Sequence, residues 1–252
     1  MRDLIVGLDA ASDRSKFGFA IGRIAENSVT IEAAGCLASG KKTGSSGLQT
    51  VAAALLSLEP GERALVAIDA PLGWPAALST NLVAHRAGNE IVADKMDLFR
   101  RKTDKRLRKL GHQPLEVGAD RIARAAVEAL SVLQSLRALT KLNLPLAWDP
   151  SFDGAAVIEV YPAATLKVRG VQSTKYKERD QADARRAIAR ALAVELIDLE
   201  SYVDGPIDAF DACICLLCAK DFLEKRCEAP GSIDVLARQE GWIWLQKAGL
   251  KE

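Results

Sequence analysis

The chain has 252 residues, of which 49% are hydrophobic and 27% are charged, and its formal net charge is +1. This composition allows a sizeable core, in one large α/β domain or two small ones, and the near-zero charge excludes a global field that attracts nucleic acid. No stretch approaches the ~18 apolar residues of a membrane-spanning helix, and the chain starts without the apolar core of a signal peptide. We therefore expect no membrane association and a cytoplasmic location.

Short apolar runs separated by polar turns predict three strands near the start of the chain, over residues 4–9, 17–23 and 29–37. Successive strands joined by short turns are typical of an antiparallel meander. An Ala/Leu-rich helix follows over residues 48–58 and ends before Pro60 and Gly61. Residues 64–69 predict a strand buried on both faces, because the run is apolar without alternation.

The middle of the chain, about residues 74–150, is mostly helical and polar in pattern, with a long helix predicted over residues 122–142. The elements predicted after it are a strand, two helices and a closing strand, over residues 155–160, 181–199, 205–226 and 241–245. Strands mixed with crossover helices predict a mixed sheet flanked by helices. We therefore expect a single domain over residues 1–252, with a mostly helical insertion at about residues 74–150.

Two of the predicted strands end in an aspartate. Asp9 closes the apolar run in the motif G-L-D-A, and Asp69 closes the run in V-A-I-D-A-P-L-G. A strand-end aspartate can also cap a turn by accepting backbone N–H groups, and for Asp9 taken alone this is the favoured interpretation. Asp69 is the stronger candidate for function, because Pro71 and Gly73 turn the chain away just after it. Functional sites of α/β sheets lie at such strand ends.

Two more aspartates, Asp208 and Asp211, lie near the start of the predicted helix 205–226, in the motif I-D-A-F-D-A. Residues three apart share a helix face, and this face continues into apolar residues, so both carboxylates are expected to point toward the core. Negative charge near a helix N-terminus is favourable by ~0.3–1 kcal/mol, which explains one exposed acid but not two on a buried stripe. Buried carboxylates that meet repel each other. A divalent metal ion is therefore the expected compensation, and metal-assisted phosphoryl chemistry is its expected use.

Glu159 lies late in the predicted strand 155–160. Two roles for it stay open, that of a further metal ligand or orienting acid and that of a partner for an arginine in the core.

The stretch 95–109 carries eight basic residues and two acids. Such a stretch beside an acidic site would bind phosphates of nucleic acid. The residues predicted to do so are Arg100, Arg101, Lys102, Thr103 and Lys105. The alternative is an ordinary solvated helix face, which is what charge runs usually form.

Five motifs, in order from residue 7 to about residue 219, resemble those of domain-of-unknown-function family 429: G-L-D-A, A-I-D-A-P-L-G, R-R-K-T-D, E-V-Y-P and D-A-F-D-A-C-I-C. That family is generally regarded as predicted nucleases with a ribonuclease H-like fold. The D-A-F-D-A run also resembles the corresponding helix of RuvC-type Holliday-junction resolvases. The resemblance implies a ribonuclease H-like mixed sheet, in which a three-strand antiparallel meander is joined by parallel strands.

The resemblance further implies the activity of a metal-dependent nuclease, which hydrolyses phosphodiester bonds of DNA or RNA. It makes Asp9, Asp69 and one or both of Asp208 and Asp211 the catalytic ligands of two Mg²⁺ or Mn²⁺ ions. Glu159 is a further candidate ligand from its place at the end of a predicted strand. Resolvases have a glutamate where this chain has Asp69. Symmetrical cutting of a junction requires a homodimer, and the sequence leaves the oligomeric state open.

Two other classes of function stay open. A non-catalytic binding or regulatory protein with this fold would keep the acids for folding, and the near-neutral net charge favours this alternative. An ATP-dependent phosphotransferase related to sugar kinases is less favoured, because such enzymes usually pair two domains of this fold and this chain has one set of acidic motifs. The loop after Asp9 also lacks the Gly and Thr expected around bound phosphates.

Overall fold

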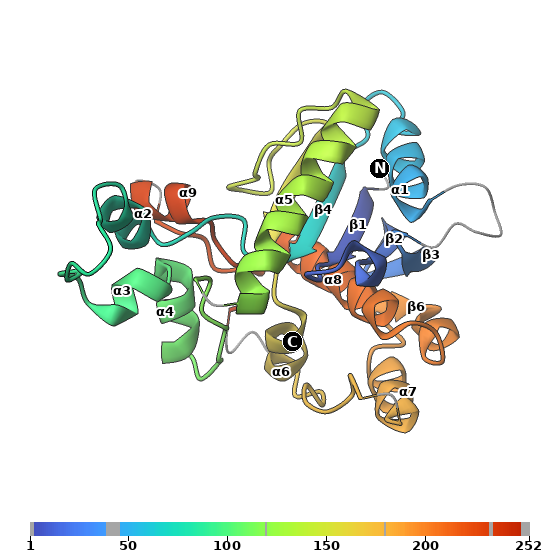
Figure 1. The fold of residues 1–252 in the computed structure, drawn as a ribbon. Helices are drawn as coiled ribbons and strands as arrows, with labels where there is room; N and C mark the ends of the chain where they lie inside the picture. Colours follow the sequence, from blue (N-terminus) through green and yellow to red (C-terminus); the bar gives the residue numbers. More distant parts are fainter. Residues whose placement is uncertain (1–2, 39–45, 119, 179, 232–233, 248–252) are drawn as a thin grey trace.

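The computed structural model describes residues 3–38, 46–118, 120–178, 180–231 and 234–247, which form a six-stranded sheet in the order β5-β4-β1-β2-β3-β6 (Figure 1). The strands are β1 (Leu4–Asp9), β2 (Gly18–Ala25), β3 (Ser28–Cys36), β4 (Ala64–Asp69), β5 (Ala155–Glu159) and β6 (Leu196–Ile197). The first three strands form the predicted antiparallel meander, and β4 and β5 extend the sheet parallel to β1. The predicted mixed sheet flanked by helices is therefore confirmed.

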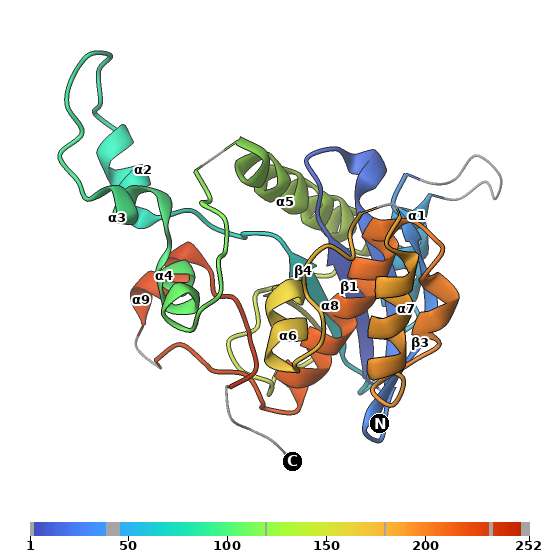
Figure 2. The ribbon, with the colours of Figure 1, turned by 90° about the horizontal axis from the view of Figure 1, so that it is seen from below.

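Helices cover both faces of this sheet. Those in the described ranges are α1 (Gly47–Leu56), α2 (Ala76–Leu82), α3 (Lys95–Phe99), α4 (Lys102–Lys109), α5 (Asp120–Thr140), α6 (Pro162–Val168), α7 (Ala182–Ala191), α8 (Ile207–Leu223) and α9 (Val235–Glu240). α1 and α5 pack on one face, whereas α8 packs on the other, with α6 and α7 beside it (Figure 2). None of the described helices is long and apolar enough to cross a membrane.

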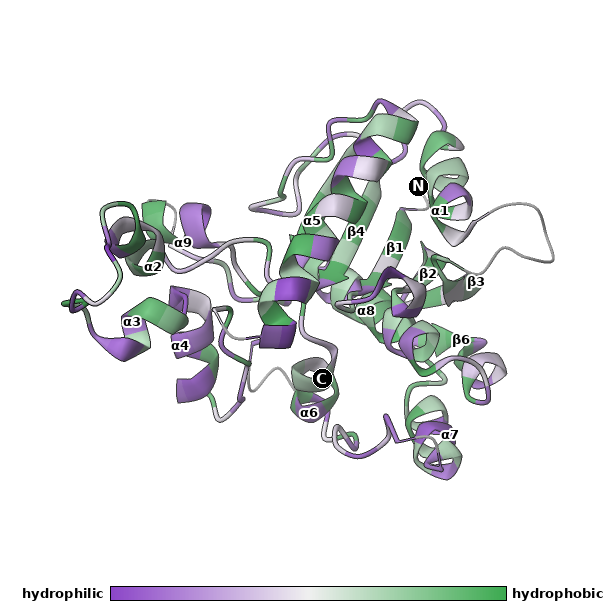
Figure 3. Ribbon diagram, viewed as in Figure 1, coloured by the Kyte–Doolittle hydropathy of each residue, from purple (hydrophilic) through white to green (hydrophobic). Residues whose placement is uncertain are grey.

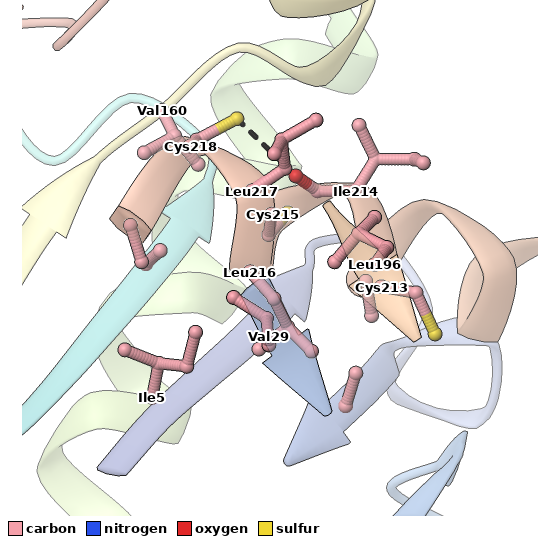
Figure 4. Packing of buried hydrophobic residues seen from close by; sticks show 14 of the residues in the cluster. Ile5, Val29, Val160, Leu196, Cys213, Ile214, Cys215, Leu216, Leu217 and Cys218 are labelled. Carbon is pink, nitrogen blue, oxygen red and sulfur yellow. Dashed lines mark hydrogen bonds between the residues drawn. The ribbon is translucent and has the colours of Figure 1, made fainter. Parts of the chain in front are cut away.

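α8 is the central helix of its layer, and it is mostly apolar, as the visible side of the helix shows in Figure 3. Every residue from Ala209 to Phe222 is buried. Figure 4 shows side chains of this helix, among them Leu216, packed with side chains of the strands such as Ile5 and Val29. A helix that is apolar on all sides belongs in a core, and here it is enclosed between the sheet and α6.

Two glycines let α8 approach the sheet closely. A Cβ atom at Gly7 would lie 2.0 Å from the carbonyl oxygen of Ala212, and a Cβ atom at Gly18 would lie 1.9 Å from that of Asp208. Both distances are far inside van der Waals contact, so only glycine permits this approach of backbone to backbone. Gly18 therefore places the N-terminal turn of α8, which carries Asp208.

We expect Gly18→Ala to lower the free energy of unfolding by about 1–3 kcal/mol, as at other overpacked core positions, because the backbone of α8 must move. Gly231→Ala is the matched control, since a Cβ atom there meets nothing within 4 Å and such surface changes cost at most ~0.5 kcal/mol. Urea denaturation of both variants and the wild type measures the difference. Equal stability of the three proteins would contradict the close approach.

A group of short helices, α2, α3, α4 and α9, projects to one side of the sheet (Figure 1). The Glu240 carboxylate at the end of α9 accepts the backbone N–H of Ala76 at 2.8 Å and that of Lys102 at 2.7 Å. These are the first residues of α2 and α4, whose N–H groups have no partner inside their own helix. Glu240 therefore joins three helices of this group from a buried position. By contrast, α5 packs against α1 and the sheet.

The helix predicted over residues 181–199 is wrong in its second half. α7 ends at Ala191, and Leu196–Ile197 forms the edge strand β6 beside β3. The backbone N–H of Val29 donates to the carbonyl of Glu195 at 2.8 Å, so pairing with the sheet replaces the helix there. The segment predicted as a closing strand over 241–245 instead makes single bridge contacts, Ile243 with Glu159 and Gln246 with Cys227.

Candidate functional site

The carboxyl ends of β1 and β4 bring Asp9 and Asp69 side by side. The two strands are parallel neighbours, and the two aspartates occupy the same register position. Neighbouring strands lie about 4.8 Å apart. Side chains alternate between the faces of a strand, and since Ile5 and Gly7 lie against the α8 layer, Asp9 faces that layer too. Because the register of the two strands matches, the Asp69 side chain points to the same face of the sheet as that of Asp9.

α8 brings Asp208 and Asp211 to the same place. Asp211 is 1% exposed, whereas Asp208 in the first turn is partly exposed. Neither carboxylate oxygen of Asp211 has a hydrogen-bond partner among the described residues. The carboxylate is instead in direct ion-pair contact with the ammonium group of Lys177. All three other aspartates act electrostatically on Asp9, so the four predicted acids lie near one another.

The site holds more negative than positive charge. Burial raises the pKa of Asp9 well above its usual value, and the charge of Asp211 raises it further. Burial also raises the pKa of Asp69, to about 7, although Lys177 opposes this. Burial lowers the pKa of Lys177, but the charges of Asp211 and Asp9 outweigh burial and hold it well above its usual value. A further cation at this point would favour the ionised form of these acids.

The pKa of Asp69 predicts how stability depends on pH. The usual aspartate pKa is 3.8 and the folded-state pKa is about 7, so between these values the folded protein binds more protons than the unfolded chain. Stability therefore falls as pH rises from about 4 to 7. A tenfold change in proton affinity is worth ~1.4 kcal/mol, and because Asp69 is partly exposed we expect a loss on the order of 2 kcal/mol.

Asp69→Asn removes this titration, so the variant should gain stability relative to the wild type as pH rises from 5 to 8. Urea denaturation at both pH values, with EDTA present to remove metal ions, measures the gain. A difference between the two proteins that stays constant with pH would contradict a raised pKa at Asp69.

Lys177 is the residue of this site that reasoning from the sequence missed. It lies between α6 and α7, in a stretch where the structure has no regular helix or strand and the sequence has no periodicity. A weak signal was present in the adjacent Tyr176, an aromatic residue in a polar stretch. Its side chain is fully buried, and its ring lies 6.2 Å from that of Phe210 in α8. A buried anchor thus fixes the position of Lys177.

A pocket of about 370 Å³ opens beside the acids. Its apolar lining includes Leu115, Ile122 and the ring of Tyr161. Its charged lining residues are Asp9, Asp69, Asp208 and Lys177, together with Arg101, Asp104 and Glu159. Pockets with apolar walls and a few convergent polar groups are the usual places for ligand binding.

Glu159, at the end of β5, points to the other face of the sheet from Asp9 and Asp69, although it lines the same pocket and acts electrostatically on Asp69. Its alternation partner Val157 belongs to the apolar cluster on the α1 and α5 side of the sheet. Glu159 accepts two hydrogen bonds from Arg101, at 2.6 and 2.7 Å, and Arg101 also pairs with Asp104. Of the two roles left open for Glu159, the structure shows the pairing with an arginine in the core.

The predicted phosphate-binding residues make contacts within the protein. Thr103 is buried, and its hydroxyl accepts the backbone N–H of Ile243 at 3.0 Å. Arg101 is buried as well. The remaining cations form ion pairs, Arg100 with Glu116, Lys102 with Asp234 and Lys105 with Asp97. Binding of nucleic acid by this stretch stays a prediction, and these contacts do not favour it.

The donor atoms of the site suit a hard divalent cation. Mg²⁺ and Mn²⁺ prefer carboxylate oxygens, and Asp9 and Asp69 supply these from adjacent strands. Within the described ranges, however, no group of three or more His, Cys, Asp or Glu side chains is placed to hold one ion. An ion at this site would therefore rest on two carboxylates, as Mg²⁺ often does when waters and a substrate phosphate complete its coordination.

Fold and site together define a mixed α/β protein with a carboxylate-rich pocket at the carboxyl ends of two parallel strands. Residues 13–234 match the model of a family described as protein of unknown function, DUF429. Because this match covers most of the chain, the protein belongs to that family, as its motifs led us to expect. Asp69, Asp208 and Asp211 lie within the matched range, and Asp9 lies just before it. No curated protein matches the chain.

Proposed function

We propose that this protein is a metal-dependent nuclease that hydrolyses phosphodiester bonds of nucleic acid. The observation that carries the proposal is the convergence of Asp9 and Asp69, at the ends of adjacent parallel strands, with Asp211 of α8 beside an open pocket. The meander β1-β2-β3 followed by the parallel strands β4 and β5 is the arrangement that the family resemblance implies, and it supports a ribonuclease H-like assignment.

In this proposal Asp9 and Asp69 hold Mg²⁺ or Mn²⁺. A bound divalent ion supplies Lewis-acid stabilisation of a phosphate and lowers the pKa of a bound water. The raised pKa of Asp69 supports the assignment, because such shifts concentrate at functional sites. Asp208 is partly exposed and lines the pocket, so it is the acid of α8 best placed to meet an incoming substrate.

One observation favours a second candidate, a non-catalytic binding or regulatory protein. Lys177 neutralises part of the acidic cluster without any metal, and Arg101 does the same for Glu159 and Asp104. Acids that are paired within the chain contribute to folding whether or not the protein cleaves anything. No feature of the described residues specifically favours a phosphotransferase.

The test of the nuclease proposal is a panel of end-labelled DNA and RNA substrates that includes single strands, duplexes and four-way junctions. We expect cleavage of at least one class in Mn²⁺ or Mg²⁺, and EDTA should abolish it. If the protein cleaves no member of the panel in either metal ion, the nuclease proposal is contradicted and the binding role is favoured. Sedimentation equilibrium on the same sample tests for the homodimer that symmetrical junction cutting requires.

A further inference from the structure

We propose that the ammonium group of Lys177 takes the place of one of the two cations expected at this site, so that the carboxylates hold a single divalent ion beside it. This inference rests on the metal site proposed above. In it the site binds one metal ion, and Lys177 substitutes for the second.

Lys177 contacts one of the buried acids directly. Its ammonium group is in ion-pair contact with Asp211, whose carboxylate is 1% exposed and accepts no hydrogen bond from the described residues. An ionised carboxylate buried in this way needs a cation. Because Lys177 is that cation, the charge of Asp211 is already compensated, and Asp211 does not need a metal ion for its burial.

Hydrogen bonds from Arg185 hold the backbone on both sides of Lys177. The guanidinium group of Arg185 is buried, and it donates to the carbonyl oxygens of the two residues that flank Lys177, at 2.8 Å to Tyr176 and 3.0 Å to Glu178. Arg185 also donates to the carbonyl of Val203 at 2.9 Å. The backbone that carries Lys177 is therefore held in place, while its side chain is 49% exposed and reaches the buried Asp211.

One divalent ion and one ammonium group balance the charge of the three buried or nearly buried acids. Asp9, Asp69 and Asp211 carry three negative charges when ionised, and one divalent ion together with one ammonium group carries three positive charges. Two divalent ions beside Lys177 would leave an excess of positive charge among these three acids. The fourth acid, Asp208, is partly exposed, so water screens its charge and its contribution is smaller.

Too few carboxylates remain beside Lys177 to hold two metal ions. Two ions lie ~4 Å apart in two-metal sites and share carboxylates between them. With the charge of Asp211 compensated by Lys177, Asp9 and Asp69 remain as the pair of carboxylates at the ends of adjacent strands. Two carboxylates are sufficient for one Mg²⁺ or Mn²⁺ that keeps several waters, but they are too few for two ions.

The experiment counts Mn²⁺ ions bound by the full chain, by calorimetry and by electron paramagnetic resonance, without substrate. We expect one ion in the wild type. Lys177→Met removes the cation that compensates the charge of Asp211, so we expect that variant to bind a second ion. The double variant Lys177→Met/Asp211→Asn removes both partners of the pair, leaves no unpaired buried charge, and should bind one ion again. Circular dichroism verifies that each variant is folded.

Two ions in the wild type would overturn the inference, even if Lys177→Met does not fold. One ion of unchanged affinity in a folded Lys177→Met would overturn it as well. The inference and the nuclease proposal fail separately. Cleavage by a wild type that binds two ions supports the nuclease and refutes the role of Lys177. One ion in the wild type and two in Lys177→Met, without cleavage of any nucleic acid, support the role of Lys177 and refute the nuclease. No binding in any of the three proteins refutes both.

Discussion

Arg101→Met should lower the free energy of unfolding by about 3–5 kcal/mol, the usual cost of removing one partner from a buried ion pair. The guanidinium group is 1% exposed. It donates to both oxygens of Glu159, at 2.6 and 2.7 Å, and to both oxygens of Asp104, at 3.0 and 3.1 Å. Methionine fills a similar volume but leaves both buried carboxylates without a cation, so the expected loss comes from electrostatics more than from packing.

Lys105→Met is the matched control from the same basic stretch. Lys105 pairs with Asp97 at the surface, where the two side chains are 34% and 55% exposed, and pairs of this kind contribute at most ~1 kcal/mol. Urea denaturation compares the two variants with the wild type. Two equally mild losses would show that the Arg101 network does not hold the short helices to the sheet.

A compensating variant tests the cause of the expected loss. Adding Asp104→Asn and Glu159→Gln to Arg101→Met removes the unpaired charges, and a buried neutral amide costs much less than a buried unpaired carboxylate. The triple variant should therefore recover much of the stability lost in Arg101→Met. A triple variant as unstable as the single one would assign the loss to packing instead.

The sheet could be predicted from the sequence because each strand carries a local signal. The runs ending at Asp9 and Asp69 are apolar and bounded by turn residues, and both form strands that end at these residues in the structure. Parallel strands that end together bring their last residues together, so the proximity of the two aspartates follows from the strand prediction. The two-residue strand β6 could not be predicted, because it exists only through its pairing with β3.

The partners of the charged residues could not be predicted, because they depend on contacts distant in sequence. Arg101 pairs with Glu159, 58 residues away, and a run of basic residues looks the same in sequence whether its members face solvent or a buried acid. Lys177 reaches Asp211 from a stretch without periodicity. The acids indicate that a counter-charge is needed, but whether it is a metal ion or a lysine depends on the tertiary structure.

Asp69→Asn should reduce kcat/KM for cleavage of nucleic acid about 10³-fold. Stabilisation of the phosphate by a metal ion is worth several kcal/mol, and ~4 kcal/mol corresponds to a factor of about 10³ at ~1.4 kcal/mol per tenfold change. The amide is close in shape to the carboxylate and cannot ionise, so this variant should also be more stable than the wild type above pH 7. Loss of cleavage together with a gain in stability separates a catalytic acid from a structural one.

Asp153→Asn is the control, because Asp153 is exposed and lies at the amino end of β5, away from the strand ends that carry the site. Cleavage should be unchanged in this variant. Asp9→Asn should match Asp69→Asn, and the double variant should cleave no more slowly than either, because residues that act through one ion have effects that do not add. If Asp69→Asn cleaves at the wild-type rate, the two strand ends do not form the active site. If the effects of the two changes multiply, Asp9 and Asp69 act separately rather than on a shared ion.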